Sequence, residues 1–151
     1  MNHATATAHL ASIAVNVPAE HALARLSDPE QVGRWALGSM GLVPAGEPGV
    51  FRGTSLFDGS DTFVEIEAHS SLGLVDYHVG TEDERSPRVS IRIADGPLAG
   101  LGPESCVIAL SAWRQAAAND ERWARTCTTH ETEVLLIKAQ LETGYTERRR
   151  A

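Results

Sequence analysis

The sequence predicts an α+β fold, in which one curved antiparallel sheet of about seven strands packs against helices on a single face. Short segments of alternating apolar and polar residues are separated by turns rich in Gly and Pro, as in meandering antiparallel strands. The last segment, about residues 117–145, instead repeats its apolar residues at spacings of three and four, as a helix does. With 151 residues, the chain is expected to form a single domain over residues 1–151, in the order β-α-α-β6-α.

The chain opens with a strand and two short helices. Residues 9–17 alternate apolar and polar side chains, which predicts a half-buried strand. Residues 19–26 place their apolar side chains on one side, which predicts a short amphipathic helix. Ser27 or Asp28 can cap a second short helix that has Pro29 at its first position.

Six further strands are expected in the middle of the chain, near residues 37–43, 50–57, 61–68, 73–80, 88–94 and 105–113. Side chains along a strand alternate between its two faces. Val75, Tyr77 and Val79 therefore share one face, which we expect to be buried. Asp76 and His78 share the opposite face, which we expect to be exposed to solvent. A register shifted by one residue would turn Asp76 and His78 toward the interior instead, and the sequence leaves this open.

The long C-terminal helix should cover the apolar face of the sheet. Arg125, Thr129 and Glu133 fall outside its apolar stripe and are expected to face solvent. Gly144 suits the position just after the end of the helix, and residues 146–151 are expected to form a flexible tail. The stripe itself follows spacings of 4, 3, 4, 3 and 4 through Trp123, Cys127, His130, Val134, Ile137 and Leu141.

Composition and charge narrow the range of partners. Acidic residues outnumber basic ones, 20 to 13, and the formal net charge of −7 disfavours nucleic acid as a partner. No apolar run reaches the roughly 20 residues that a membrane span needs, so no membrane insertion is expected. The N-terminal residues lack the charged and apolar regions of a secretory signal, so we expect a cytoplasmic protein.

No motif for a metal or a cofactor stands out. Cys106 and Cys127 form no CxxC pair, which disfavours a zinc framework. Cys127 and His130 could share one helix face, but no third ligand lies near them in the sequence, so no metal is expected. The sequence also lacks GxSxG, HExxH and phosphate-loop motifs, so no catalytic residue and no cofactor follow from a motif.

Three segments resemble a known superfamily. The run IAVNVPAEHALARLSDPEQVGRW (13–35), the segment VDYHVG (75–80) and the segment HETEVLLIKAQLE (130–142) are similar to the SRPBCC or START-like superfamily, which includes polyketide cyclases and dehydrases. The resemblance spans nearly the whole chain and lies mainly in the order of the elements. It implies the helix-grip fold, in which a curved sheet wraps around a long C-terminal helix.

His130 and Tyr77 are the polar residues expected to point into the space between helix and sheet. His130 could bind a ligand or act as a general base, or it could be a core histidine with a structural partner. Tyr77 could offer its hydroxyl to a ligand, or bond a nearby carbonyl as a plain core tyrosine. The expected ligand-binding residues are Tyr77, His130, Val134, Phe57 and Cys127. The tryptophans Trp35, Trp113 and Trp123 are expected in the core.

The function expected first is binding of a small, largely apolar or aromatic molecule in this cavity. The resemblance also implies two alternatives. One is a polyketide cyclase- or dehydratase-like lyase, in which His130 would move a proton and Tyr77 would hold a substrate oxygen. The other is a co-chaperone-like interaction module, which would need an exposed apolar patch on the outer face of the sheet. The sequence does not decide between enzyme and binding protein, and it leaves the ligand and the oligomeric state open.

Overall fold

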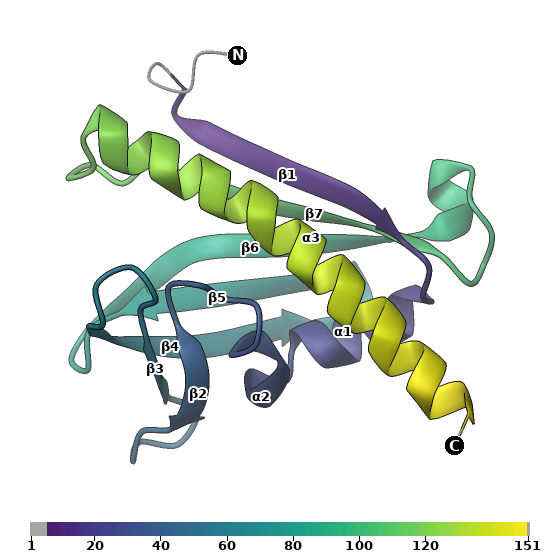
Figure 1. The fold of residues 1–151 in the computed structure, drawn as a ribbon, viewed down its shortest axis with the longest axis horizontal. Helices are drawn as coiled ribbons and strands as arrows, with labels where there is room; N and C mark the ends of the chain where they lie inside the picture. The colour runs from purple at the N-terminus through teal and green to yellow at the C-terminus, as the bar shows by residue number, and fades with distance from the viewer. Residues whose placement is uncertain (1–5, 151) are drawn as a thin grey trace.

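Seven antiparallel strands form one curved sheet in the computed structural model, which describes residues 6–150 (Figure 1). The strand order is β1-β7-β6-β5-β4-β3-β2, so β1 joins β7 and the other strands pair with their neighbours in sequence. Residues 1–5 and 151, which include part of the N-terminal segment and of the expected tail, lie outside the described residues. The strands are β1 (Ala8–Val15), β2 (Met40–Pro44), β3 (Phe51–Thr54), β4 (Asp61–His69), β5 (Leu74–Gly80), β6 (Arg85–Asp95) and β7 (Cys106–Trp113). The helices are α1 (Ala19–Leu26), α2 (Pro29–Val32) and α3 (Asp120–Arg150), with short 3-10 helices η2 (Ser70–Leu72) and η3 (Gly96–Ala99).

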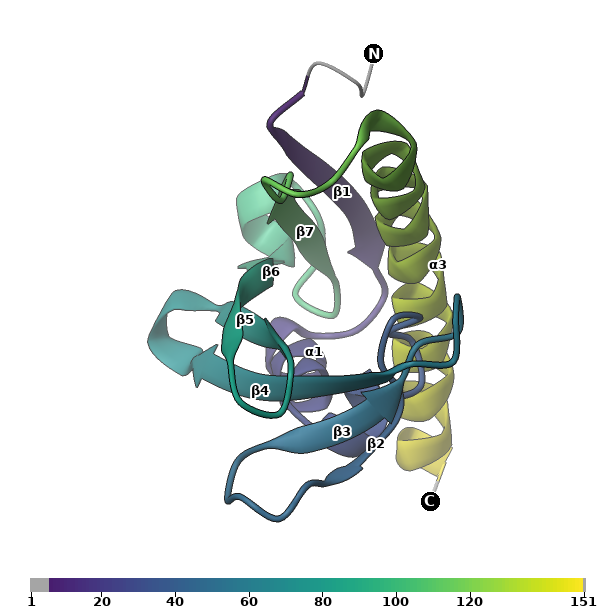
Figure 2. The same cartoon turned by 90° about the vertical axis from the view of Figure 1, so that its left-hand side faces the viewer.

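The long helix α3 runs across the concave face of the sheet and follows β1, an edge strand, in both views (Figures 1 and 2). Two polar contacts hold it there. The Nζ of Lys138 donates to the carbonyl of Ala14 at 3.0 Å, and the backbone N–H of Asn16 donates to a carboxylate oxygen of Glu142 at 2.8 Å. The helix is therefore offset toward the β1 edge of the sheet, and this offset positions the site described below.

The core lies between the concave face of the sheet and the helices. Strand residues and residues of the α3 stripe meet there, and the buried set includes Val15, Val75, Ile91, Ile108, Leu110, Val134, Ile137 and Leu141. Tyr77 is also buried on this face, whereas Asp76 and His78 lie on the outer face and are half-buried. The predicted register of β5 is therefore confirmed, because Val75 and Tyr77 point toward the core.

The two short helices begin as their sequences predict. The first covers the expected residues 19–26, after the extended residue Pro18. The second starts at Pro29, and the Asp28 side chain accepts a hydrogen bond from the N–H of Glu30 at 3.1 Å. Asp28 rather than Ser27 is thus the capping residue, as expected of a carboxylate that satisfies a free amide at a helix start.

Helix α3 ends later than predicted. Gly144 lies within it, and the helix continues through Arg150, so the described residues from 146 onward are helical rather than a tail. A Cβ at position 144 would lie 2.7 Å from a guanidinium nitrogen of Arg25, so the Arg25 side chain of α1 packs against the helix at this glycine. No proline interrupts the last turns, and their basic side chains are favourable at a helix C-terminus.

Two other expectations fail at strand ends. Trp35 and Trp123 are buried as predicted, but Trp113 is 63% exposed. Ala112 is buried in β7, whereas Trp113, the last residue of the strand, lies at the exposed end of the sheet and is not covered by the core. Strand β3 is also shorter than predicted, because residues 55–60 form a turn in which the N–H of Ser55 donates to the carbonyl of Ser60 at 2.8 Å.

Candidate functional site

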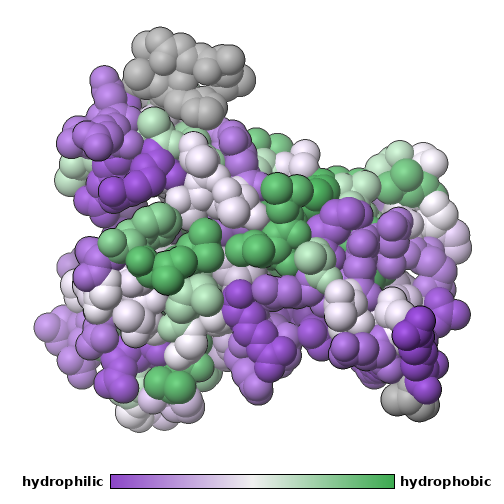
Figure 3. All heavy atoms as spheres, in the orientation of Figure 1, coloured by the Kyte–Doolittle hydropathy of each residue, from purple (hydrophilic) through white to green (hydrophobic). Residues whose placement is uncertain are grey.

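A cavity of about 480 Å³ lies between α3 and the concave face of the sheet. Its apolar walls come mainly from strands β4 to β7 and include Val64, Val79, Val89 and Ala112. Residues of α2 and the segment after it, of the β3–β4 turn and of the N-terminal half of α3 complete the lining. Outside, a band of apolar surface crosses the middle of the face viewed in Figure 1, between hydrophilic areas (Figure 3). The volume falls within the range of pockets that take small molecules.

A polar stripe of α3 forms one side of this cavity. The expectation that Arg125, Thr129 and Glu133 face only solvent is wrong, because all three line the cavity and Glu133 is buried. The physical reason is the offset of α3 toward β1, which turns a second helix face toward the open half of the sheet. The polar stripe of α3 consists of four residues at spacings of 4, 3 and 4, namely Arg122, Thr126, Thr129 and Glu133.

His130 lies at the border between the apolar stripe and this polar stripe. Its side chain is buried and lines the cavity, and its Nδ1 has no hydrogen-bond partner within the described residues 6–150. Burial, and to a lesser degree the charge of His9, lower the pKa of His130 to about 4. At neutral pH the imidazole is therefore uncharged, and its Nδ1 is enclosed without a hydrogen-bond partner in the described part of the chain. This agrees with the expectation that His130 faces the interior.

Glu133 is a buried carboxylic acid beside His130, and the sequence analysis missed it. One carboxylate oxygen accepts the N–H of Leu37 at 2.9 Å, and the other lies 3.9 Å from Nε2 of His130. Burial raises the pKa of Glu133 to about 7, although the Leu37 hydrogen bond opposes this. Because burial disfavours the charged form of both side chains, the two are better described as neighbouring groups that burial keeps from charging together than as an ion pair.

Tyr77 occupies the place that the sequence predicted but uses its hydroxyl structurally. The O–H donates to the carbonyl of Leu26 at 2.6 Å, which fixes the end of α1 against β5. Its ring lines the cavity and packs edge-on against Trp35, with 5.7 Å between ring centroids. Burial, and then the charge of Glu133, raise the pKa of Tyr77 well above its usual range, so the phenol stays protonated. The phenol oxygen can still accept a hydrogen bond.

The other three expected ligand-binding residues divide into two groups. Phe57 lines the cavity at its rim, half exposed, with the guanidinium of Arg125 5.4 Å from the ring centroid. Val134 and Cys127 are buried, and the structure places them in the core and not in the lining of this cavity. They belong to the apolar stripe rather than to the polar stripe of α3. Burial raises the pKa of the Cys127 thiol, which makes it a poor nucleophile.

Three arginines line the same cavity. Arg88 comes from β6 and is half-buried, and Arg122 and Arg125 come from α3 and are exposed at the rim. Among the residues that the structure describes, none of the three guanidinium groups forms an ion pair or a hydrogen bond. This positive side of the cavity contrasts with the net charge of −7 of the whole chain.

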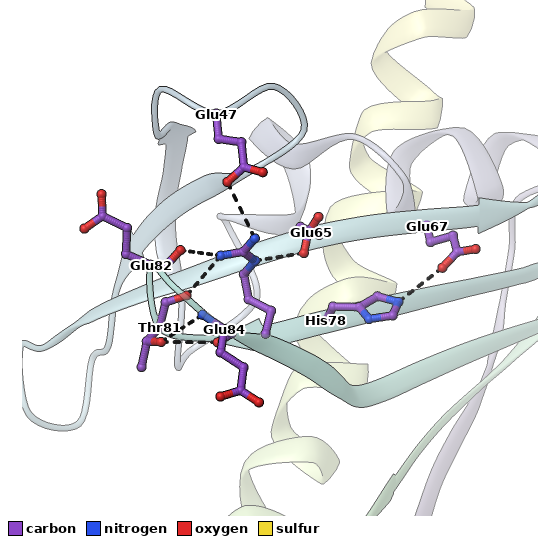
Figure 4. Close-up of polar contacts among 8 residues, drawn as sticks. Glu47, Glu65, Glu67, His78, Thr81, Glu82 and Glu84 are labelled. Atoms are coloured by element: carbon purple, nitrogen blue, oxygen red, sulfur yellow. Dashed lines mark hydrogen bonds and ion pairs between the residues drawn. The ribbon is translucent and has the colours of Figure 1, made fainter.

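The outer face of the sheet carries a separate network of charged residues that pair with one another (Figure 4). Nε of Arg85 donates to a Glu65 oxygen at 2.8 Å, and a Glu47 oxygen lies 3.8 Å from the same guanidinium group. Nε2 of His78 lies 3.2 Å from a Glu67 oxygen. His78 therefore belongs to this outer network and not to the cavity.

One group of side chains on the outer face could hold a metal ion. Glu67, His69 and Asp76 each offer a ligand atom within 4.8 Å of the others. Nε2 of His69 lies 3.3 Å from a Glu67 oxygen and 3.5 Å from an Asp76 oxygen, so these groups also pair without a metal. The sequence analysis missed the group because Glu67 and His69 share one face of β4, while the third member, Asp76, comes from β5 and meets them only through strand pairing.

No helix among residues 6–150 is both long and apolar enough to cross a membrane.

Comparisons with known proteins find similarity in structure and not in sequence. Neither a protein-family model nor a curated protein matches the sequence. A START superfamily protein from Mycobacterium smegmatis matches over 95% of this chain and 99% of its own, at 14% identity and a TM-score of 0.57. The Aha1 dimer from Colwellia psychrerythraea matches over 92% of this chain and 98% of its own, at 12% identity and a TM-score of 0.64. The di-domain ARO/CYC BexL from the BE-7585A biosynthetic pathway matches over 91% of this chain but 46% of its own, at 11% identity and a TM-score of 0.63.

Identities this low support a shared fold and nothing finer. The shared features are those that the sequence resemblance implied, namely a curved seven-stranded antiparallel sheet and a long C-terminal helix across its concave face. The chain therefore has the START-like, or SRPBCC, helix-grip fold.

Proposed function

We propose that the protein binds a small, largely apolar or aromatic molecule in the cavity between α3 and the sheet. The observation that carries this proposal is the cavity itself, about 480 Å³ in volume, whose wall includes the buried polar side chains of His130 and Glu133. A concave, largely apolar space with a few polar groups in its wall is the usual form of a binding site for a small molecule. Valine and alanine side chains supply the apolar walls around it.

A second candidate function is a lyase of the cyclase or dehydratase kind, and Glu133 favours it. A carboxylic acid with a pKa of about 7 can both give and take a proton at neutral pH. The neutral imidazole of His130, 3.9 Å from that carboxyl group, could relay the proton. Tyr77 would contribute its phenol oxygen as an acceptor only, because its O–H is donated to Leu26.

The named neighbours support both candidates. One belongs to the START superfamily and another is an ARO/CYC protein of a biosynthetic pathway. The Aha1 neighbour is consistent with the third candidate, a co-chaperone-like interaction module. That function would need an apolar outer face of the sheet, whereas this face carries the charged network of Figure 4. We further propose a cytoplasmic protein without a nucleic-acid partner, which its two free, buried cysteines and its net charge of −7 support.

The neutral fluorescent probe N-phenyl-1-naphthylamine tests the proposed function. It should bind the purified protein, and Thr129→Phe, which places a large ring inside the cavity, should weaken binding by about tenfold or more. Thr128→Phe is the matched control, because Thr128 is the adjacent residue and is exposed. Circular dichroism establishes that both variants fold. Equal affinities in the two variants would show that the probe binds elsewhere and would contradict the proposal. Native mass spectrometry of gently isolated protein would then identify the bound molecule.

A further inference from the structure

The cavity has a positively charged side in a chain that is acidic overall. Arg88, Arg122 and Arg125 all line it, and no ion pair or hydrogen bond neutralises their guanidinium groups within residues 6–150. With 20 acidic residues against 13 basic ones, carboxylate partners are in excess across the chain. Three unpaired arginines around one cavity are therefore unexpected from composition.

A local irregularity in β6 brings Arg88 into the cavity. Val89 pairs with Tyr77, but the next pair joins Pro87 to His78, so Arg88 is an extra residue in its strand. Regular alternation would place Arg88 and Val89 on opposite faces, whereas both line the cavity. Bulges of this kind re-aim a side chain and are common next to functional sites. The bulge gives the concave face a charged group at a position where alternation would give it none.

The electrostatics of this arrangement favour an anion. Burial, and then the charge of Arg122, lower the pKa of Arg88, so Arg88 is partly desolvated and close to a like charge. The acidic residues that line the cavity do not relieve this. Oδ1 of Asp58 accepts hydrogen bonds from the N–H and the O–H of Ser60, and Glu133 accepts one from the N–H of Leu37. Within the described residues, neither carboxyl group lies within ion-pair distance of an arginine.

We propose that the ligand carries an oxyanion, of the carboxylate, sulfonate or phosphate class, which Arg88 and Arg122 bind at the rim of the cavity. This inference rests on the proposed function, since it adds an anionic group to the small molecule that the cavity takes. Two guanidinium groups can donate several charge-assisted hydrogen bonds to one oxyanion. Arg125, which lies over the ring of Phe57, borders the same rim. The apolar body of the ligand would lie against the valines, with the anion toward solvent.

The test compares two probes that differ by one anionic group. N-phenyl-1-naphthylamine is neutral, and 8-anilinonaphthalene-1-sulfonate has the same aromatic skeleton with a sulfonate. The sulfonate probe should bind about tenfold more tightly, and high salt should weaken its binding but not that of the neutral probe. Arg88→Gln and Arg122→Gln should each remove most of this preference, measured as the ratio of the affinity for the sulfonate probe to the affinity for the neutral probe. Arg92→Gln is the control, because Arg92 lies on the same strand, is exposed and does not line the cavity.

The outcomes separate the two proposals. Binding of the neutral probe with no gain from the sulfonate would overturn the anion inference and leave the proposed function standing. Binding of neither probe would overturn both. If Arg92→Gln reduced the preference for the sulfonate probe as much as the cavity variants do, the preference would reflect the overall charge of the protein. That result would also overturn the inference. Arg122 is exposed on a helix, so Arg122→Gln serves where Arg88→Gln fails to fold. Displacement of the sulfonate probe by decanoate or by decyl phosphate, with decanol as the neutral control, distinguishes a carboxylate from a phosphate ligand.

Discussion

Replacing Glu133 by Gln should make the protein more stable at neutral and alkaline pH and change little in acid. Glu133 has an ordinary pKa of 4.5, which burial raises to about 7 in the folded state. A carboxyl group with a raised folded-state pKa contributes stability below its unfolded pKa, and that contribution is lost as the pH rises through the folded pKa. The loss therefore falls between about pH 4.5 and about pH 7, and it amounts to about 3 kcal/mol. Gln resembles the protonated acid and keeps an oxygen for the N–H of Leu37.

The measurement is the free energy of unfolding by urea for wild type and Glu133→Gln, across about pH 4 to about pH 8. The difference between the two should grow toward high pH in favour of the variant. The unfolding free energy of wild type alone would not show this loss. Stability contributed by His130 rises with pH over nearly the same range, so the two pH dependences largely cancel. Glu121→Gln, an exposed change in the first turn of the same helix, is the control for the loss of one acidic side chain without burial. A pH-independent difference for Glu133→Gln would refute the reasoning, since it would mean that water in the cavity solvates the carboxylate.

Three further variants test the rest of the site and its support. His130→Leu removes a group whose pKa falls from 6.5 to about 4 on folding, so wild type should lose about 3 kcal/mol relative to this variant as the pH falls through that range, measured by urea unfolding. Tyr77→Phe leaves the Leu26 carbonyl without its donor and should cost about 1–3 kcal/mol of unfolding free energy, while affinity for the neutral probe stays within about twofold. Val134→Ala should cost about 2–4 kcal/mol through a buried cavity, whereas Leu135→Ala, at a position that is 60% exposed, should change the unfolding free energy by less than about 0.5 kcal/mol. Equal losses at the last two positions would mean that the buried face of α3 is assigned wrongly.

Periodicity in the sequence was enough to predict the architecture. Alternation in residues 73–80 placed Val75 and Tyr77 on the buried face, and the structure has them there. The segment 19–26 was predicted as a helix with the bounds that the structure shows. These features depend on local patterns of apolar residues and on turn residues, which act within a few positions of the chain. Local signals are the part of a fold that one sequence displays most directly.

The candidate site was predicted only in part, because its other half depends on how elements pack. His130 and Tyr77 follow from their places in apolar patterns. Glu133 does not, since a position just beside an apolar stripe is normally exposed on an amphipathic helix. It becomes buried because α3 follows the β1 edge and turns that flank toward the sheet. The i, i+3 spacing of His130 and Glu133 was the available signal.

Arg88 was beyond prediction for a different reason. The sequence around it reads as a regular strand, in which Val89, Ile91 and Ile93 share a face. Only the pairing with β5 shows that the strand contains an extra residue. Pro87, which lacks a backbone N–H, is consistent with a break in regular pairing, but it does not say which neighbour is re-aimed.

The offset of α3 and the bulge in β6 act together on the same space. The offset leaves the concave face near β4 to β6 uncovered and turns Thr126, Thr129 and Glu133 toward it. The bulge then adds the guanidinium of Arg88 from the opposite wall. One cavity thus has an interior in which burial disfavours the charged forms of His130 and Glu133. At its rim, three arginines form no ion pair or hydrogen bond through their guanidinium groups within the described chain. A molecule with an apolar body, one polar atom that reaches His130 and an anionic end at the rim would satisfy both regions at once. Together, these requirements restrict the range of possible ligands more than the fold alone does.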